Sequence, residues 1–329
     1  MTLDGDTPAQ EATMSNSFFI RRELCPACRS KDHSTLYSCS YSDPSLREYL
    51  QSFYAPQGKI QFEYLCGATY VLEECDDCGL VFQREIPNDF LMTKLYEEWI
   101  DPGIALEKHV ETTSLDHYSG YAREIMMLIA YFKTVPSEMR LLDFGMGWGR
   151  WCMMANAFGC DSCGTELSET RIEYAKSHGV KVLKWEEVTG HRFDVINLEQ
   201  VLEHIPEPLE TLRYLRGALK RQGLAKVSVP DGGDIKERLK ICDWTAPKGS
   251  KKSLNAVSPL EHINCFNRRA ITRMADIAGF EIVEIPFSIQ CAYSTNWRLL
   301  KPALKNILRP LYRSVLHRGT YVFLRQKGE

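Results

Sequence analysis

The sequence predicts an α/β protein: a doubly wound, mostly parallel seven-stranded sheet, preceded by a small cysteine-rich domain. Three observations predict it. Residues 141–166 read as a strand, a glycine turn, a helix and a second strand. Apolar runs and helical patterns then alternate as far as residue 325, which is typical of a parallel sheet. Two Cys-x-x-Cys motifs stand well before these elements and indicate a separate unit.

Composition and charge are those of an ordinary globular chain. Of the 329 residues, 44% are hydrophobic and 25% are charged, and the net charge is −3. The small negative charge gives no support to nucleic-acid binding. No apolar run approaches the roughly 18 residues of a membrane span, and residues 1–17 lack the apolar core of a signal peptide. We therefore expect a cytoplasmic protein in which residues 1–20 form a disordered tail.

The two Cys-x-x-Cys motifs predict a metal site. Twelve cysteines in a chain without an export signal indicate metal ligands and buried thiols rather than disulfides. Two such motifs can place four thiolates around one zinc ion, which leaves no open position for catalysis. We expect a structural zinc in a zinc-ribbon-like module over residues 21–88, with free thiols or a redox pair as the alternative. The expected ligands are Cys25, Cys28, Cys75 and Cys78.

The rest of the chain reads as helices followed by the main sheet. Residues 89–136 form a helical lead-in, because apolar residues recur at helical spacing over 118–132. Further helices are expected between the strands, among them one over 267–278, and residues 234–259 read as an insertion. The strands are expected at 139–144, 160–166, 180–183, 193–198, 224–229, 281–286 and 320–325, the last of them antiparallel.

The stretch 141–166 has the layout of a nucleotide site. Asp143 ends the first strand, and the turn after it carries three glycines that let the backbone approach a ligand closely. The helix that follows points its N-terminal N–H groups at the same place. Glu166, about twenty residues further on, is placed to accept hydrogen bonds from a ribose. The spacing is G-x-G-x-G rather than the dinucleotide G-x-G-x-x-G, which argues against a nicotinamide oxidoreductase.

This arrangement resembles motif I of the class I S-adenosylmethionine (SAM) methyltransferases, a family with a Rossmann-like fold. The resemblance runs from about residue 139 to residue 327 and implies a SAM-dependent methyltransferase domain over 137–329. The H-x-N-x-F pattern at 262–266, followed by a Gly-Phe pair, is similar to the ubiquinone-methylase-like group. The four-cysteine module resembles that of some bacterial small-molecule methyltransferases, including sugar methyltransferases.

The resemblance implies a set of cofactor residues. In the family the turn after the third strand contacts the adenine, and the segment after the fourth strand faces the methyl end. Two bulky residues, Met146 and Trp148, depart from the usual small residues and would narrow the methionine end. The implied cofactor residues are Asp143, Gly145, Gly147, Gly149, Glu166, Trp185, Glu186, Glu199 and Gln200.

The resemblance also places a histidine at the mouth of the active site. His262 is therefore the candidate general base, since its ordinary pKa near 6.5 suits proton removal at neutral pH. Tyr118 and Glu199 are the further catalytic candidates. In the alternative interpretation, His262 holds its loop in place through hydrogen bonds. The methyl group of SAM is already activated, so catalysis needs mainly orientation and a deprotonated acceptor, which we expect to be a sugar or a hydroxylated metabolite.

The sequence is compatible with two other functions. The zinc module could dock an RNA or protein substrate, although the acidic residues beside the second cysteine pair argue against RNA. The chain could also bind SAM without catalysis, if the two bulky residues close the pocket. Separately, residues 297–318 form a basic amphipathic stretch that could contact a membrane surface or a partner, or cap the domain with a solvated face.

Overall fold

The computed structural model describes residues 18–111, 114–291, 304, 308, 310–316 and 319–328. Residues 1–17 of the expected tail lie outside this range, as does most of the amphipathic stretch 297–318. Among the described residues, no helix combines the length and the apolar character needed to cross a membrane.

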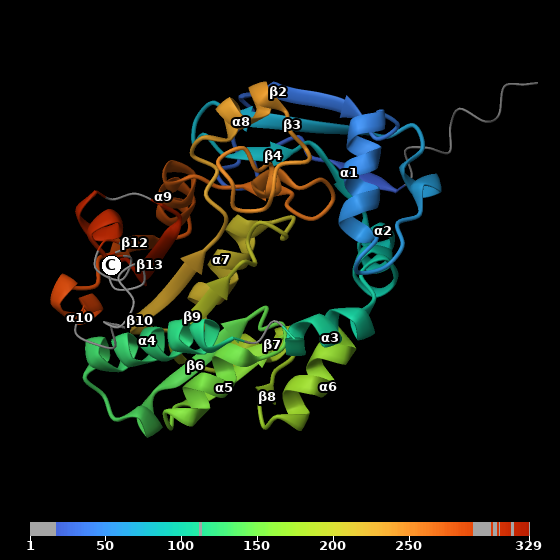
Figure 1. Ribbon diagram of the computed structural model, residues 1–329. Helices are drawn as coiled ribbons and strands as arrows, with labels where there is room; N and C mark the ends of the chain where they lie inside the picture. The colour runs from blue at the N-terminus through green and yellow to red at the C-terminus, as the bar shows by residue number, and fades with distance from the viewer. Residues whose placement is uncertain are drawn as a thin grey trace, which may run out of the picture.

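The main sheet has seven strands in the order β12-β13-β10-β9-β6-β7-β8, which confirms the predicted fold class (Figure 1). Its neighbouring strands run parallel, except that β13 is antiparallel to both β10 and β12. All seven strands overlap the predicted ranges. They are β6 (Arg140–Phe144), β7 (Asp161–Thr165), β8 (Lys181–Val182), β9 (Phe193–Glu199), β10 (Leu219–Ser228), β12 (Phe280–Val283) and β13 (Tyr321–Gln326).

Helices cover both faces of this sheet, because successive strand residues point to opposite sides. Leu142 and Ile196 pack on α7 (Pro208–Arg216) and α9 (Arg268–Ile277). Their chain neighbours Leu141 and Val195 pack on α4 (Leu115–Phe132) and α5 (Arg150–Ala157). The helix α6 (Glu169–Ser177) follows β7 and lies beside α5 in Figure 1.

A smaller sheet lies above the carboxyl edge of the main one, in the order β11-β4-β3-β2 (Figure 1). Its strands are β2 (His33–Ser40), β3 (Thr69–Cys75), β4 (Val81–Gln83) and β11 (Asn264–Cys265). A short pair, β1 (Phe19–Arg21) and β5 (Glu85–Pro87), runs antiparallel beside it. Residues 18–20, which the sequence placed in the tail, are therefore part of the folded chain.

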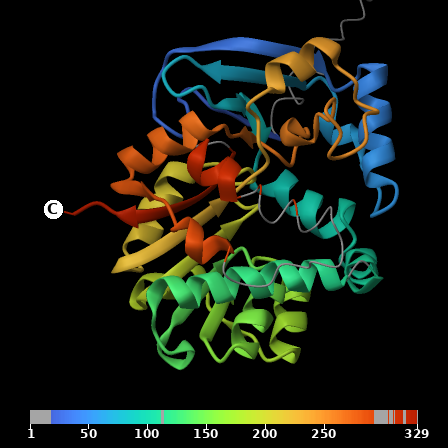
Figure 2. The same ribbon diagram turned by 60° about the vertical axis from the view of Figure 1, so that its left-hand side comes forward.

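The smaller sheet shares its core with the segment read as an insertion. Helix α1 (Pro44–Tyr54) begins after the Asp43 cap and buries Leu46, Leu50 and Tyr54 on one face. That face joins a cluster with Trp244 and Leu260 of the distant segment. The helix α8 (Ile235–Ile241) packs there too, and Figure 2 shows it against the strands of the smaller sheet. The sequence range 21–88 thus omits the part that completes this unit.

Four short helices lie in the connections: η1 (Phe62–Leu65), η3 (Pro136–Glu138), η5 (Asn255–Val257) and η6 (Leu311–Val315). Other helices link the two sheets or belong to the main domain. They are α2 (Asp89–Lys94), the π-helix η2 (Leu95–Trp99) and α3 (Pro102–Glu111), which with α4 make up the predicted helical lead-in, and η4 (Trp185–Gly190) and α10 (Phe287–Cys291) in the main domain.

One buried arginine, Arg22, links the smaller sheet to the main domain through Asn264. The side chain of Arg22 is 7% exposed, and burial lowers its pKa to about 9. Its guanidinium donates to Asn264 Oδ1 at 2.8 Å, to the Ile263 carbonyl at 2.7 Å and to the Gln83 carbonyl. Asn264 in turn donates to the Leu202 carbonyl at 3.0 Å. The chain around β11 is therefore held from both sides.

Candidate active site

The glycine turn after β6 is shaped by close packing and by backbone conformation. Gly145, Gly147 and Gly149 have φ of 71°, 55° and 76°, a region that favours glycine. A Cβ on Gly145 would lie 2.8 Å from Val201, whereas one on Gly147 would meet no atom within 4 Å. Gly145 therefore lies against the next loop, and Gly147 faces open space where a ligand can approach.

Asp143 and Asn197 end the neighbouring strands β6 and β9 and are paired. Asn197 Nδ2 donates to Asp143 Oδ1 at 2.7 Å, and Asp143 is 4% exposed. Burial raises the pKa of Asp143 to about 7, while the bond from Asn197 acts in the opposite direction. Asn197 Oδ1 is buried without a hydrogen-bond partner among the described residues. A donor such as an ammonium group would satisfy it.

Glu166 lies at the end of β7, where the sequence predicts the ribose contact. It accepts hydrogen bonds from the backbone N–H of Gly147 at 2.9 Å, of Leu167 at 2.9 Å and of Ser168 at 3.1 Å. The carboxylate therefore braces the glycine turn, and its position beside Gly147 keeps it next to the open face of that turn.

Asp143, Asn197 and the first two glycines of the turn line a cavity of about 300 Å³, whereas Glu166 is not among its lining residues. Met146 is 6% exposed and packs on Gly164, where a Cβ would lie 2.3 Å from its sulfur. Trp148 packs edge-on against Tyr174. The two bulky residues contribute to the wall and leave the cavity open. The lining residues are Tyr121, Asp143, Gly145, Met146, Gly147, Trp148, Arg150, Trp151, Asn197, Glu199 and Gln200.

A second cavity, of about 480 Å³, adjoins the first. It lies between α4, the carboxyl ends of β9 and β10, and the start of β13. Tyr121 and Glu199 line both cavities, so the two meet at these side chains. The further lining residues of the second cavity are His117, Gly120, Arg123, Glu124, Met127, Ser228, Gln290, Pro310, Arg313 and Tyr321.

A buried network of charges contains two residues that line the cavities, Glu124 and Glu199. Lys226 of β10 is 1% exposed and donates to Glu124 at 2.7 Å and to Glu199 at 2.9 Å. Burial alone would raise the pKa of Glu124, but Lys226 lowers it below its ordinary value. This network was not predicted from the sequence. Its signal in the sequence is a lysine between the apolar residues Ala225 and Val227 of β10.

His262, the candidate base, lines neither cavity. Its Nδ1 forms a hydrogen bond with the Asn255 carbonyl, and its ring lies edge-on to His204. Burial and the neighbouring His204 lower the pKa of His262 to about 3, so the imidazole is neutral and a weak proton acceptor. Its role as a base stays a prediction, and the observed bond is the one expected if His262 holds its loop.

A buried carboxyl group lies beside the two histidines. Glu203 is 1% exposed, and neither of its carboxyl oxygens has a hydrogen-bond partner among the described residues. Burial raises the pKa of Glu203 to about 8, so the group is mostly the neutral acid at pH 7. One oxygen lies 4.0 Å from His204 Nε2.

The other predicted residues lie around the edge of the site. Trp185 is 39% exposed, stacks on Tyr214 and touches Phe144 with its edge. Glu186, next in the chain, is exposed. Gln200 lines the first cavity with a φ of 55°, unusual for a residue other than glycine. Tyr118 lies one turn before Tyr121 on α4 and does not line either cavity.

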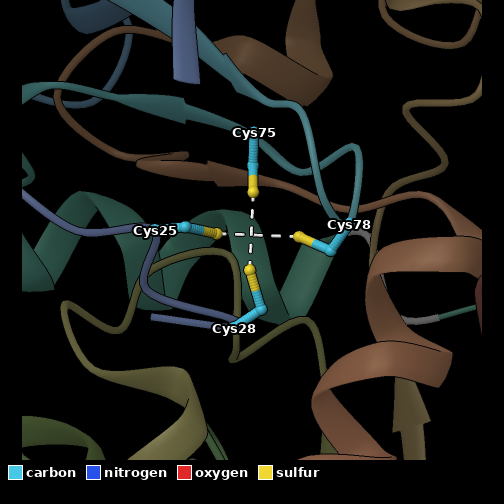
Figure 3. Close-up of side chains that lie close together, drawn as sticks. All are labelled: Cys25, Cys28, Cys75 and Cys78. Carbon is cyan, nitrogen blue, oxygen red and sulfur yellow. Dashed lines mark hydrogen bonds between the residues drawn. The ribbon is translucent and has the colours of Figure 1, made fainter. Parts of the chain in front are cut away.

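The four predicted metal ligands converge, as Figure 3 shows. Their sulfur atoms all lie within 4.8 Å of one another, with 3.6 Å between Cys25 and Cys78 and 3.4 Å between Cys28 and Cys75. A tetrahedral zinc with Zn–S bonds near 2.3 Å needs sulfur atoms about 3.8 Å apart. The donor set therefore fits a closed, structural zinc site.

The cysteine cluster also docks on the main domain. Arg29, next to the first pair, forms ion pairs with Glu207 at 2.8 Å and Glu210 at 3.0 Å at the start of α7. Asn267, which caps α9, donates to the Gly79 carbonyl at 2.6 Å. A metal bound here would fix the smaller sheet against both helices.

Comparison with known proteins supports the fold and the class of enzyme. Residues 115–285, just over half of the chain, match the model of a family described as "Methyltransferase domain". The chain belongs to this methyltransferase family. The match begins in α4 and ends after β12, so it contains the glycine turn and most of the lining of both cavities. The resemblance to class I SAM-dependent methyltransferases is thereby confirmed.

The curated relatives that match this chain are all named ubiquinone biosynthesis O-methyltransferase. The chain is 26% identical over 156 residues to the ubiquinone biosynthesis O-methyltransferase of Bartonella tribocorum, covering 43% of this chain and 63% of that protein. It is 28% identical over 143 residues to the enzyme of the same name from Cereibacter sphaeroides, covering 39% of this chain and 58% of that protein. The chain thus spans less than two thirds of either relative's length.

Among solved structures, the plantazolicin methyltransferase BpumL in complex with a monoazolic desmethylPZN analog and SAH aligns with a TM-score of 0.47 and 16% identity. The alignment covers 72% of this chain and 94% of that one.

Proposed function

We propose that the protein is a SAM-dependent methyltransferase that acts on a small hydroxylated acceptor. The observation that carries the proposal is the meeting of two cavities at Tyr121 and Glu199. One cavity has the glycine turn and the paired carboxylate and amide of a SAM site. The other has room for a small molecule and opens onto the same carboxylate. The relatives' name, an O-methyltransferase, supports a hydroxyl group as the acceptor.

The residues of the first cavity would hold SAM, which supplies an activated methyl group. Asp143 and Asn197 Oδ1 are placed to accept hydrogen bonds from the methionine ammonium, since one is a carboxylate and the other lacks a donor. Glu166 would turn one oxygen to the ribose. Trp185, exposed at the edge and backed by Tyr214, offers a flat surface for the adenine.

The residues of the second cavity would orient the acceptor. Glu199 reaches both spaces, so its carboxylate can accept the proton of the acceptor hydroxyl as the methyl group arrives. Tyr121 closes the other side of the junction and excludes water there. His262 is the alternative base from the sequence. A Glu199→Gln variant separates the two when SAM is saturating, because turnover should then be abolished only if Glu199 takes the proton.

We propose that the four cysteines hold a structural zinc ion. The support is the distance between their sulfur atoms, which suits the four-coordinate, all-thiolate set of a structural zinc site. Metal analysis of the purified chain tests this, with one equivalent of zinc expected and none in a Cys25→Ser/Cys75→Ser variant.

Titration calorimetry with SAM tests the cofactor assignment. We expect micromolar binding, weakened at least tenfold by Glu166→Ala and unchanged by Glu173→Ala, an exposed position on α6. Formation of S-adenosylhomocysteine (SAH) from SAM in the presence of a panel of hydroxylated metabolites tests catalysis. Binding of SAM without SAH formation for any acceptor would support the non-catalytic alternative.

A further inference from the structure

Lys226 is a buried charge that the proposed function does not yet explain. It lies in β10 between apolar residues, on the face covered by α4 and α5. Removing an ammonium group from water costs several kcal/mol unless close partners compensate for it. Two carboxylates compensate here, Glu124 at 2.7 Å and Glu199 at 2.9 Å.

The two carboxylates differ in how many contacts they make. Both oxygens of Glu124 accept hydrogen bonds: its Oε1 accepts from Lys226 and from Trp151 at 2.8 Å, and its Oε2 accepts from Tyr321 at 2.7 Å. Glu199 shares only Oε2 with Lys226. Its Oε1 has no hydrogen-bond partner in the described part of the chain, and its side chain is 36% exposed. Lys226 therefore connects a fixed carboxylate to one that faces the cavities.

We propose that Lys226 is a positioning residue. It holds the Glu199 carboxylate at the junction of the two cavities, so that the site binds the positively charged sulfonium of SAM in preference to neutral SAH. This inference rests on the proposed function. A methyl group that passes from one cavity to the other must cross the junction, so the sulfur of SAM belongs next to Glu199. A carboxylate next to the sulfur attracts a positively charged sulfonium, and it has no such attraction for a neutral thioether.

The charges balance over the reaction. The bond from sulfur to the methyl carbon breaks, its electron pair stays on sulfur, and a new bond forms from the acceptor oxygen to the methyl carbon. The acceptor proton moves to Glu199. The sulfonium and the carboxylate therefore lose their charges in the same turnover, and the attraction that favoured SAM is absent for SAH. Product release is favoured for the same reason.

The preference is measured by calorimetry as the Kd for SAH divided by the Kd for SAM. We expect Glu199→Gln to lower this ratio about tenfold, which corresponds to about 1.4 kcal/mol. The double variant Lys226→Met/Glu124→Gln removes one positive and one negative charge and leaves Glu199 charged but unanchored. We expect it to lower the ratio nearly as far.

A matched control lies on the same strand. Lys220 pairs with Asp194 at 2.8 Å at the other end of β10, away from both cavities. Lys220→Met should leave the ratio unchanged. If the double variant fails to fold, Glu199→Asp replaces it, because it keeps the charge on a shorter side chain and should also lower the ratio.

Each outcome bears on one proposal. A wild-type ratio in the folded double variant or in Glu199→Asp, with a lowered ratio in Glu199→Gln, would overturn the role of Lys226. An unchanged ratio in Glu199→Gln would overturn the placement of the sulfur beside Glu199. Failure of the wild-type chain to bind either SAM or SAH would instead contradict the proposed function, and the two failures are thereby distinguished.

Discussion

The two sheets of this protein are built in opposite ways. In the main sheet, each strand and the helix that covers it are close in sequence, and the glycine turn that forms the first cavity lies within one short stretch. The smaller sheet is assembled from residues 18–87 together with residues 235–265, and a four-cysteine cluster and the buried Arg22 hold it in place. The main sheet is specified by local pattern, whereas the smaller one depends on a few long-range groups. Single substitutions should therefore damage the smaller sheet more.

Loss of the metal should have the largest effect. If zinc fixes the smaller sheet, then Cys75→Ser should cost about 5 kcal/mol or more of unfolding free energy, since metal binding and folding of such units are coupled. Thermal unfolding together with zinc analysis measures this. Cys66→Ser, at an exposed cysteine outside the cluster, is the matched control and should unfold as the wild type does. Equal stability of the two variants would show that the cysteine cluster does not hold the smaller sheet.

Arg22→Met should have the next largest effect. The substitution leaves the carbonyls of Gln83 and Ile263 and the side chain of Asn264 without their buried donor, which should cost about 3 kcal/mol. Urea unfolding measures it. Arg21→Met removes an exposed ion pair one residue earlier and should change the stability by less than about 0.5 kcal/mol. A similar loss in both variants would contradict the long-range account.

Within the main sheet, two glycines test whether packing or conformation matters more. Gly145→Ala combines a positive φ with a contact of 2.8 Å to Val201, so we expect a loss of about 2–3 kcal/mol. Gly147→Ala has the same kind of φ but open space around it, so we expect about 1 kcal/mol. Its main effect should be on SAM affinity, because the new methyl group points where the ligand approaches. Equal losses of stability would mean that Val201 moves aside.

A further effect lies between the two sheets and depends on pH. Glu203 has a pKa of about 8 in the folded chain and an ordinary value of 4.5 when unfolded. Between these values the folded state binds more protons, so its contribution to stability is present at low pH and falls as pH rises, by at most about 1.4 kcal/mol per pH unit. Glu203→Gln cannot ionise. The difference in unfolding temperature between this variant and the wild type should therefore increase in favour of the variant from pH 5 to pH 8. A difference that stays constant with pH would contradict a buried neutral acid at Glu203.

The same contrast explains what the sequence could and could not reveal. The strand positions, Asp143, the three glycines and the cysteine pairs follow from spacing along the chain, and the structure brings them together as expected. The strand β11 did not follow from spacing along the chain, because its two residues form a strand only by pairing with β4. The Lys226 network was also missed, since its members come from α4, β9, β10 and β13. Motif resemblance alone placed His262 at the active site, and the structure puts it outside both cavities.

A crystal structure of the chain with SAH tests the central claim most directly. We expect SAH in the cavity of the glycine turn, with its ribose at Glu166 and its sulfur at the junction formed by Tyr121 and Glu199, open toward the cavity beneath α4. An SAH molecule whose sulfur points away from Glu199, or one bound elsewhere on the chain, would contradict the account.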